Sequence, residues 1–167
     1  MFRKILKITL EFCIYVVIVG AVVWGMPTYL SHKFNTKYPF AAITSGSMWP
    51  VLKTGDLVFI KHVAKEDIKL GDIVVWQNPA GNGFTIHRVV ALATTTLTTK
   101  GDANFSEDTP VLYGAVIGRT LTRSAQPGVK PVRVPYLGYI SMWSAGIQGT
   151  LANSGTVVYT ASANKQP

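Results

Sequence analysis

The feature that most constrains this chain is an uncharged run near its start. The 19 residues from Phe12 to Leu30 carry no charged side chain, and a helix needs roughly 20 apolar residues to cross a bilayer. Trp24 and Tyr29 lie toward the far end of the run, where aromatic rings prefer the membrane interface. Residues 1–7 carry three cations, which favours a cytoplasmic N-terminus. The run therefore predicts a membrane-spanning helix with the rest of the chain outside the cytoplasm.

A cleavable signal peptide is the competing interpretation. Its apolar region would be shorter, about 7–15 residues, and would end in a small-x-small site. Here the run is longer and ends in Trp-Gly-Met-Pro-Thr-Tyr. We therefore expect an uncleaved anchor, whereas removal of the segment would leave a soluble secreted protein.

Composition narrows the classes of partner and cofactor. The formal net charge of +8 suits a nucleic acid or an anionic membrane surface. No basic run alternates with aromatic residues, so we expect the lipid bilayer and no nucleic acid. Cys13 is the only cysteine, which excludes a disulfide framework and a CxxC metal site. The three histidines lack HExxH spacing, so we expect no metal.

The rest of the chain reads as short strands between turns. Gly-Asp pairs at 55–56 and 71–72 each open an apolar, β-branched segment. The turn cluster at 78–83 predicts a hairpin between Asp72–Gln77 and Phe84–Leu92. Further strands are expected at 38–44, 94–100, 114–122 and 129–134, with one helical turn within 64–70. No long amphipathic helix is visible in this part, so we predict a mainly β fold: an N-terminal transmembrane helix followed by an all-β domain.

The C-terminal tail is uncharged from Val134 to Asn164. Polar residues and glycines interrupt it too often to predict a second membrane helix. An interfacial segment beside the bilayer and a disordered end are the two alternatives.

Serine chemistry is the main functional indication. A serine hydroxyl is a weak nucleophile until a base takes its proton, and a histidine does so near neutral pH with an acid that orients it. Ser47 follows Gly46, which permits a tight turn. His87 lies in a predicted strand on the face that also carries Thr85 and Val89.

The sequence offers other histidines and several acids for this chemistry. His32 and His62 lack comparable surroundings. For the acid, the loop at 101–108 offers Asp102, Glu107 and Asp108, which the residue pattern alone does not rank.

These motifs together resemble those of the type I signal peptidases, the membrane-bound serine proteases that remove signal peptides. Ser45-Gly46-Ser47-Met48-x-Pro50 resembles the nucleophile motif, and the Gly-Asp strands at 55–58 and 71–75 resemble core-strand motifs. His87-Arg88-Val89 stands where the bacterial branch has Lys-Arg, and histidine there marks the endoplasmic-reticulum-type branch, which includes archaeal and some bacterial enzymes. Residues 99–104 followed by Asp108 resemble that branch's acid box, with Ala103 and Glu107 in place of the more usual Asn and Asp, and residues 134–139 resemble its segment after the core.

The resemblance implies a role for each candidate residue. Ser47 would be the nucleophile, His87 the general base and Asp108 the triad acid, with Asp102 supporting the site. The Ser47 backbone N–H and the Ser45 hydroxyl would stabilise the oxyanion. The implied reaction is acyl-enzyme hydrolysis of preproteins after small residues, without a cofactor.

The resemblance also implies an organisation and a location. The expected parts are a cytoplasmic N-terminus at 1–11, an anchor at 12–30, a β-rich serine peptidase domain at 31–143 and a tail at 144–167. The expected partners are signal-peptide-bearing preproteins, the bilayer, and accessory subunits or a translocon. A single-pass protein of a prokaryotic plasma membrane is favoured, with the endoplasmic reticulum as the alternative. The alternative functions are a membrane-anchored β-domain that binds exported chains without cutting them and, in the same fold, a protease with another substrate.

Overall fold

A computed structural model describes residues 2–78, 83–123 and 130–148 of the chain. The predicted turn at 78–83, the expected strand at 129–134 and the tail at 144–167 therefore lie partly outside the described residues.

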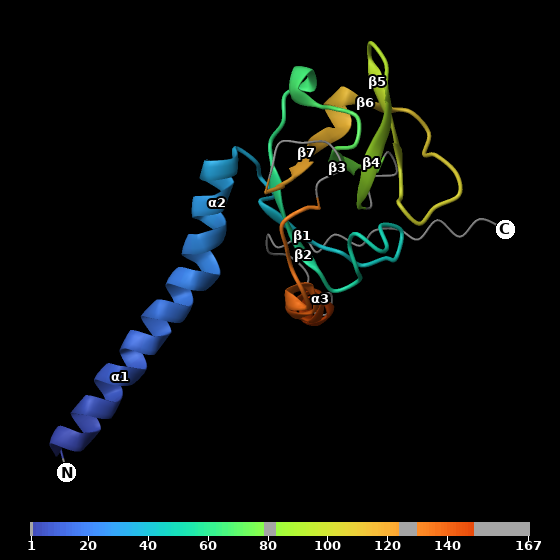
Figure 1. The fold of residues 1–167 in the computed structure, drawn as a ribbon. Helices are drawn as coiled ribbons and strands as arrows, with labels where there is room; N and C mark the ends of the chain where they lie inside the picture. Colours follow the sequence, from blue (N-terminus) through green and yellow to red (C-terminus); the bar gives the residue numbers. More distant parts are fainter. Residues whose placement is uncertain (1, 79–82, 124–129, 149–167) are drawn as a thin grey trace.

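The N-terminal segment is one long helical rod that projects away from the rest of the molecule (Figure 1). It consists of α1 (Phe2–Gly20), a π-helical turn (Ala21–Gly25) and α2 (Met26–Phe34). The turn ends two residues before Pro27, which has no N–H to donate to the preceding turn of helix. From Arg3 to Phe34 the helix is apolar enough to cross a membrane, with a mean hydropathy of 2.2 in its best 18-residue window and none of that window buried. The helix is longer than the expected anchor at 12–30 and includes it.

The remainder is a mainly antiparallel β-domain, as predicted. Its strands are β1 (Phe40–Ala42), β2 (Leu57–Lys61), β3 (Ile73–Gln77), β4 (Phe84–Leu92), β5 (Thr96–Lys100), β6 (Val111–Leu112), β7 (Val116–Thr120) and β8 (Arg133–Val134), with short 3-10 turns at Lys65–Asp67 and Tyr113–Ala115. They pair in the order β1-β2-β7-β3-β4-β5-β6, and β8 also pairs with β2. The predicted hairpin is β3–β4, in which Val74 lies opposite His87. The strand β6 was not predicted.

The core lies on both faces of the central strand β3. Its residues 73–76 are all buried, because successive side chains of a strand point to opposite faces. Ile73 and Val75 belong to one apolar cluster with Met48 and Ile86. Val74 and Trp76 belong to a second cluster on the other face. His87 emerges from the strand next to β3, on the Val74 side of the sheet.

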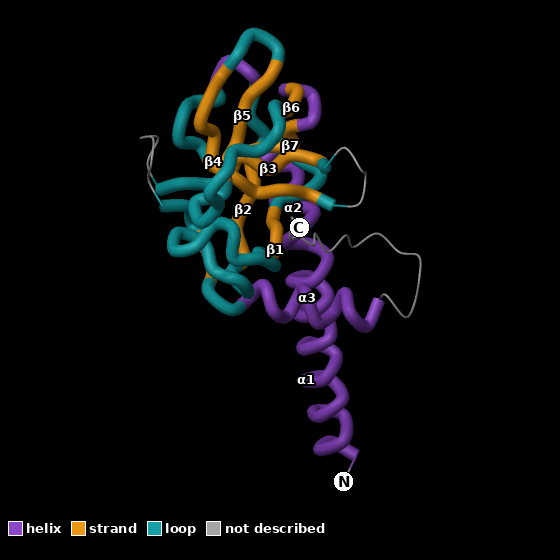
Figure 2. Tube along the Cα trace, turned by 90° about the vertical axis from the view of Figure 1, so that its right-hand side faces the viewer, coloured by secondary structure: helices purple, strands orange, loops and turns teal. Residues whose placement is uncertain are grey.

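A third helix, α3 (Leu137–Gln148), follows the β-domain and was not predicted. It lies on the side of the domain toward which α1 extends (Figure 2). The helix approaches the 55–56 turn very closely: the Gly138 N–H donates to Gly55 O at 2.9 Å, and a Cβ at Gly138 would lie 2.7 Å from that oxygen. The glycine that weakened the helix prediction is therefore needed for this contact.

Candidate active site

Ser47 lies on a tight turn that is fastened at both sides. Within the turn, the Trp49 N–H donates to Gly46 O at 3.0 Å, and the Ala103 N–H donates to Ser47 O at 2.8 Å. The next side chain, Met48, is 1% exposed in the apolar core. Ser47 itself is half-buried and lines a small pocket, on a backbone that these hydrogen bonds fix.

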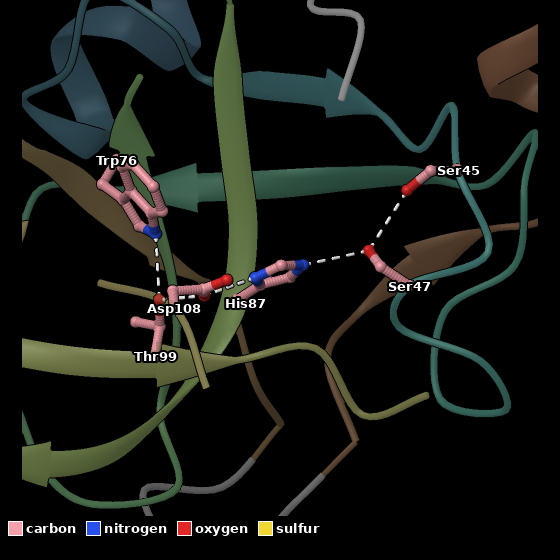
Figure 3. Close-up of polar contacts among 6 residues, drawn as sticks. All are labelled: Ser45, Ser47, Trp76, His87, Thr99 and Asp108. Carbon is pink, nitrogen blue, oxygen red and sulfur yellow. Dashed lines mark hydrogen bonds and ion pairs between the residues drawn. The ribbon is translucent and has the colours of Figure 1, made fainter. Parts of the chain in front are cut away.

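Three side chains from distant parts of the sequence meet at this turn (Figure 3). Ser47 Oγ lies 3.1 Å from His87 Nε2. His87 Nδ1 lies 2.6 Å from Asp108 Oδ2. The histidine is buried and comes from β4, whereas the half-buried aspartate comes from the loop between β5 and β6. The arrangement can relay a proton from the serine hydroxyl to an imidazole that a carboxylate orients.

The three acids that the residue pattern alone left unranked have different contacts in the structure. Asp108 contacts His87, and its backbone N–H donates to Thr99 O at 2.8 Å. Asp102 instead pairs with Arg88, whose Nε and Nη2 donate to its two carboxylate oxygens at 2.8 and 2.7 Å. Glu107 is exposed. The remaining histidines, His32 and His62, are exposed as well.

The Arg88–Asp102 pair connects the sheet to the loop at 101–108, which we call the acid loop. Arg88 Nη1 also donates to Gly71 O at 2.8 Å. The hydrogen bond to Asp102 is the main cause that raises the pKa of Arg88 above its ordinary value; burial opposes it, and the charge of Asp102 adds to it. Asp102 therefore contacts a charged Arg88 rather than His87, and it lies on the same loop as Asp108.

Ser45 lies beside the candidate nucleophile. Its hydroxyl oxygen is 3.1 Å from Ser47 Oγ. Among the described residues, none accepts a hydrogen bond from the Ser47 backbone N–H. Both groups can thus donate to an oxygen placed near Ser47.

Sequence reasoning missed two residues of the site. Thr99 and Trp76 lie behind Asp108: Trp76 Nε1 donates to Thr99 Oγ1 at 3.2 Å, and Thr99 Oγ1 donates to Asp108 Oδ2 at 2.6 Å. The strand register could have indicated them, because Val74 lies opposite His87 and Thr99 opposite Val89. Directly opposed residues share a face of the sheet.

A mainly β domain with a serine, a histidine and an aspartate in one hydrogen-bonded line has the architecture of a serine peptidase. Comparison with known sequences gives the particular family. Residues 9–120 match the family described as "Signal peptidase, peptidase S26". The chain belongs to this family.

The chain is also similar to named fungal proteins. It is 32% identical over 119 residues to the "Signal peptidase complex catalytic subunit SEC11" of Zygosaccharomyces rouxii, covering 68% of this chain and 70% of the relative. It is 30% identical over 138 residues to the protein of that name from Lachancea thermotolerans, covering 75% and 81%. A third relative, sec11 of Pyrenophora teres f. teres, is 31% identical over 120 residues, covering 68% and 67%.

Proposed function

We propose that this serine endopeptidase removes signal peptides from exported preproteins with Ser47 as nucleophile, His87 as general base and Asp108 as the residue that orients His87. The observation that supports these roles is the line of contacts from Ser47 Oγ through His87 to Asp108 Oδ2, at 3.1 and 2.6 Å. A non-catalytic binding domain would predict that these three residues do not converge, so the two contacts favour the catalytic interpretation.

The reaction has two steps. In the first, Ser47 Oγ bonds to the scissile carbonyl carbon while its proton passes to His87 Nε2, and that proton then goes to the leaving amine as the C–N bond breaks. In the second, a water takes the place of the amine: its oxygen bonds to the acyl carbon, its proton passes to His87, and Ser47 leaves with that proton. Asp108 holds the other ring nitrogen, Nδ1, so that Nε2 faces the serine in both steps.

The developing oxyanion needs donors beside Ser47. The Ser47 backbone N–H and the Ser45 hydroxyl are the groups that we assign to this role, because the first lacks a described partner and the second lies 3.1 Å from Ser47 Oγ. Loss of one such donor typically lowers kcat by about 10²–10³-fold.

The substrate would bind as an added strand beside the serine turn. β1 begins the strand order, so one of its edges pairs with no strand among the described residues, and an extended peptide can add to such an edge. A small apolar pocket lies between that strand and the serine, lined by Ala42, Ile43, Ser45, Ser47, Met48, Phe84 and Ile86. Its small size favours a small side chain before the cleaved bond.

The anchor would hold the site next to the membrane face where an apolar signal peptide emerges. We propose the orientation with the N-terminus in the cytoplasm and the β-domain outside, because residues 1–7 carry three cations. The fungal relatives are named as subunits of a complex, so the proposal includes accessory membrane subunits. These relatives do not support the preference for a prokaryotic plasma membrane, which we drop.

The test is cleavage of a signal-peptide-bearing precursor by the full-length protein in liposomes. The wild type should cut after a small residue, as determined by N-terminal sequencing of the product. Ser47→Ala should abolish the cut. Ser106→Ala removes an exposed serine hydroxyl of the acid loop and should leave the rate unchanged.

Two results would refute the roles. Equal cleavage by Ser47→Ala and wild type would remove Ser47 as nucleophile. Cleavage by His87→Ala at the wild-type rate would refute the role of His87 as general base.

A further inference from the structure

Behind the three candidate catalytic residues lies a buried pair that the reaction above does not use. Thr99 is 0% exposed and Trp76 is 6% exposed. They continue the line of hydrogen bonds beyond Asp108. Six side chains are thus connected one to the next in space: Ser45, Ser47, His87, Asp108, Thr99 and Trp76 (Figure 3).

The direction of this line follows from donor chemistry. An indole N–H can only donate, so Thr99 Oγ1 accepts from Trp76 at 3.2 Å. The hydroxyl proton of Thr99 is then available for its 2.6 Å contact with Asp108 Oδ2. Asp108 thus receives a hydrogen bond on the same oxygen that faces His87 Nδ1 at 2.6 Å.

The direction of the remaining contacts follows from this point. A carboxylate only accepts hydrogen bonds, so His87 Nδ1 carries a proton and donates it to Asp108. The neutral ring then has a lone pair on Nε2, and Ser47 donates its hydroxyl proton there across 3.1 Å. Ser45 in turn donates to Ser47 Oγ.

We propose that Thr99, held by Trp76, is a positioning residue that fixes Asp108 as an oriented carboxylate and so keeps His87 in the tautomer that can accept the Ser47 proton. This proposal rests on the proposed roles of His87 and Asp108. Thr99 and Trp76 are both buried behind Asp108. Both act through Asp108, which otherwise sits on a loop at the edge of the sheet.

The test compares four variants of the full-length protein in liposomes. Thr99→Val keeps the shape of the side chain and removes the hydroxyl, whereas Thr99→Ser keeps the hydroxyl. Trp76→Phe keeps an aromatic ring and removes the N–H donor. Thr120→Val is the matched control, because Thr120 is 2% exposed in β7 and its hydroxyl has no partner among the described residues.

The expected results distinguish loss of the Thr99 hydroxyl from a change in side-chain packing. Thr99→Val should lower kcat by about 10- to 100-fold with an unchanged KM, as expected for a lost hydrogen bond to a charged group. Thr99→Ser should recover most of that loss, Trp76→Phe should lower kcat by about 3- to 10-fold, and Thr120→Val should match the wild type. Equal losses in Thr99→Val and Thr99→Ser, or no loss in Thr99→Val, would overturn the proposal.

A spectroscopic readout keeps the inference testable without activity. ¹⁵N NMR of histidine-labelled protein in detergent micelles reports which ring nitrogen carries the proton, with His32→Gln and His62→Gln to assign the His87 signals. We expect an Nδ1–H tautomer in the wild type and a mixture with Nε2–H in Thr99→Val. An unchanged tautomer in Thr99→Val would refute the positioning role of Thr99. Equal cleavage by wild type and Ser47→Ala would instead refute the proposed function, so the two failures can be distinguished.

Discussion

The two aspartates of the acid loop give the sharpest separation of roles. Asp108→Asn and Asp102→Asn each remove one negative charge and keep the side-chain shape. At position 108 the lost oxygen lies 2.6 Å from both His87 Nδ1 and Thr99 Oγ1. An amide NH₂ in that place forces His87 Nδ1 to accept, which moves the ring proton to Nε2 and blocks transfer from Ser47. A wrong histidine tautomer lowers kcat by about 10⁴-fold in serine proteases, and we expect a loss of about 10³–10⁴-fold here.

At position 102 the substitution affects His87 only indirectly. Asp102 contacts Arg88 rather than His87, and Arg88 retains its hydrogen bond to Gly71 O. Asp102→Asn should therefore lower kcat by about tenfold or less, through a looser acid loop.

The assay is kcat on a fluorogenic signal-peptide substrate in detergent, with circular dichroism to verify that both variants are folded. A folded Asp108→Asn that retains more activity than a folded Asp102→Asn would refute the assignment of the orienting acid.

Three further predictions concern the support of the site and the anchor. Gly101→Ala should lower kcat by about 10²-fold, because its Cβ would lie 2.7 Å from Ser47 O and from Asn104 Nδ2 and would displace the serine turn. Gly114→Ala is the control, because its Cβ would meet nothing within 4 Å. Equal rates for the two variants would contradict the prediction. Arg88→Lys should lower the melting temperature measured by circular dichroism, since lysine cannot reproduce the two-point contact with Asp102. Because the pKa of Arg88 is raised, its ion pair is lost only as pH rises through that raised value, so the decrease should be the same at pH 7 and pH 9, and a decrease at one pH alone would contradict this account. Removal of residues 1–34 should slow cleavage of a liposome-bound precursor far more than cleavage of a short soluble peptide, because the anchor confines enzyme and substrate to one surface, whereas equal slowing would indicate damage to the domain.

The parts of the fold that could be predicted depend on local chemistry. The turns at Gly55-Asp56 and Gly71-Asp72 have glycine φ angles of 88° and 87°, which glycine adopts without strain. The Asp56 and Asp72 carboxylates accept from the backbone N–H groups of Lys53 and Lys69 at 2.9 and 3.0 Å. Such turns, and the β3–β4 hairpin that follows them, are determined by residues that are close together in the sequence.

The parts that could not be predicted depend on contacts between distant residues. α3 forms where Gly138 and Tyr139 pack on the Gly55 turn, and no periodicity in the tail indicates that partner. β6 has only two residues, Val111 and Leu112, too few to show alternation. At the site, Ser47 and His87 could be proposed from their motifs, and the resemblance to the family favoured Asp108 over Asp102. The residue pattern alone did not rank the two acids, because their difference depends on the position of Arg88 on the sheet.

The central claim is that Ser47 is the nucleophile activated by His87. The most direct measurement is covalent labelling by a peptidyl fluorophosphonate, with the modified residue located by mass spectrometry of the digested protein. The account predicts one adduct, on Ser47, formed by the wild type and strongly slowed in His87→Ala. An adduct on Ser45, or labelling of Ser47 at the same rate without His87, would contradict it.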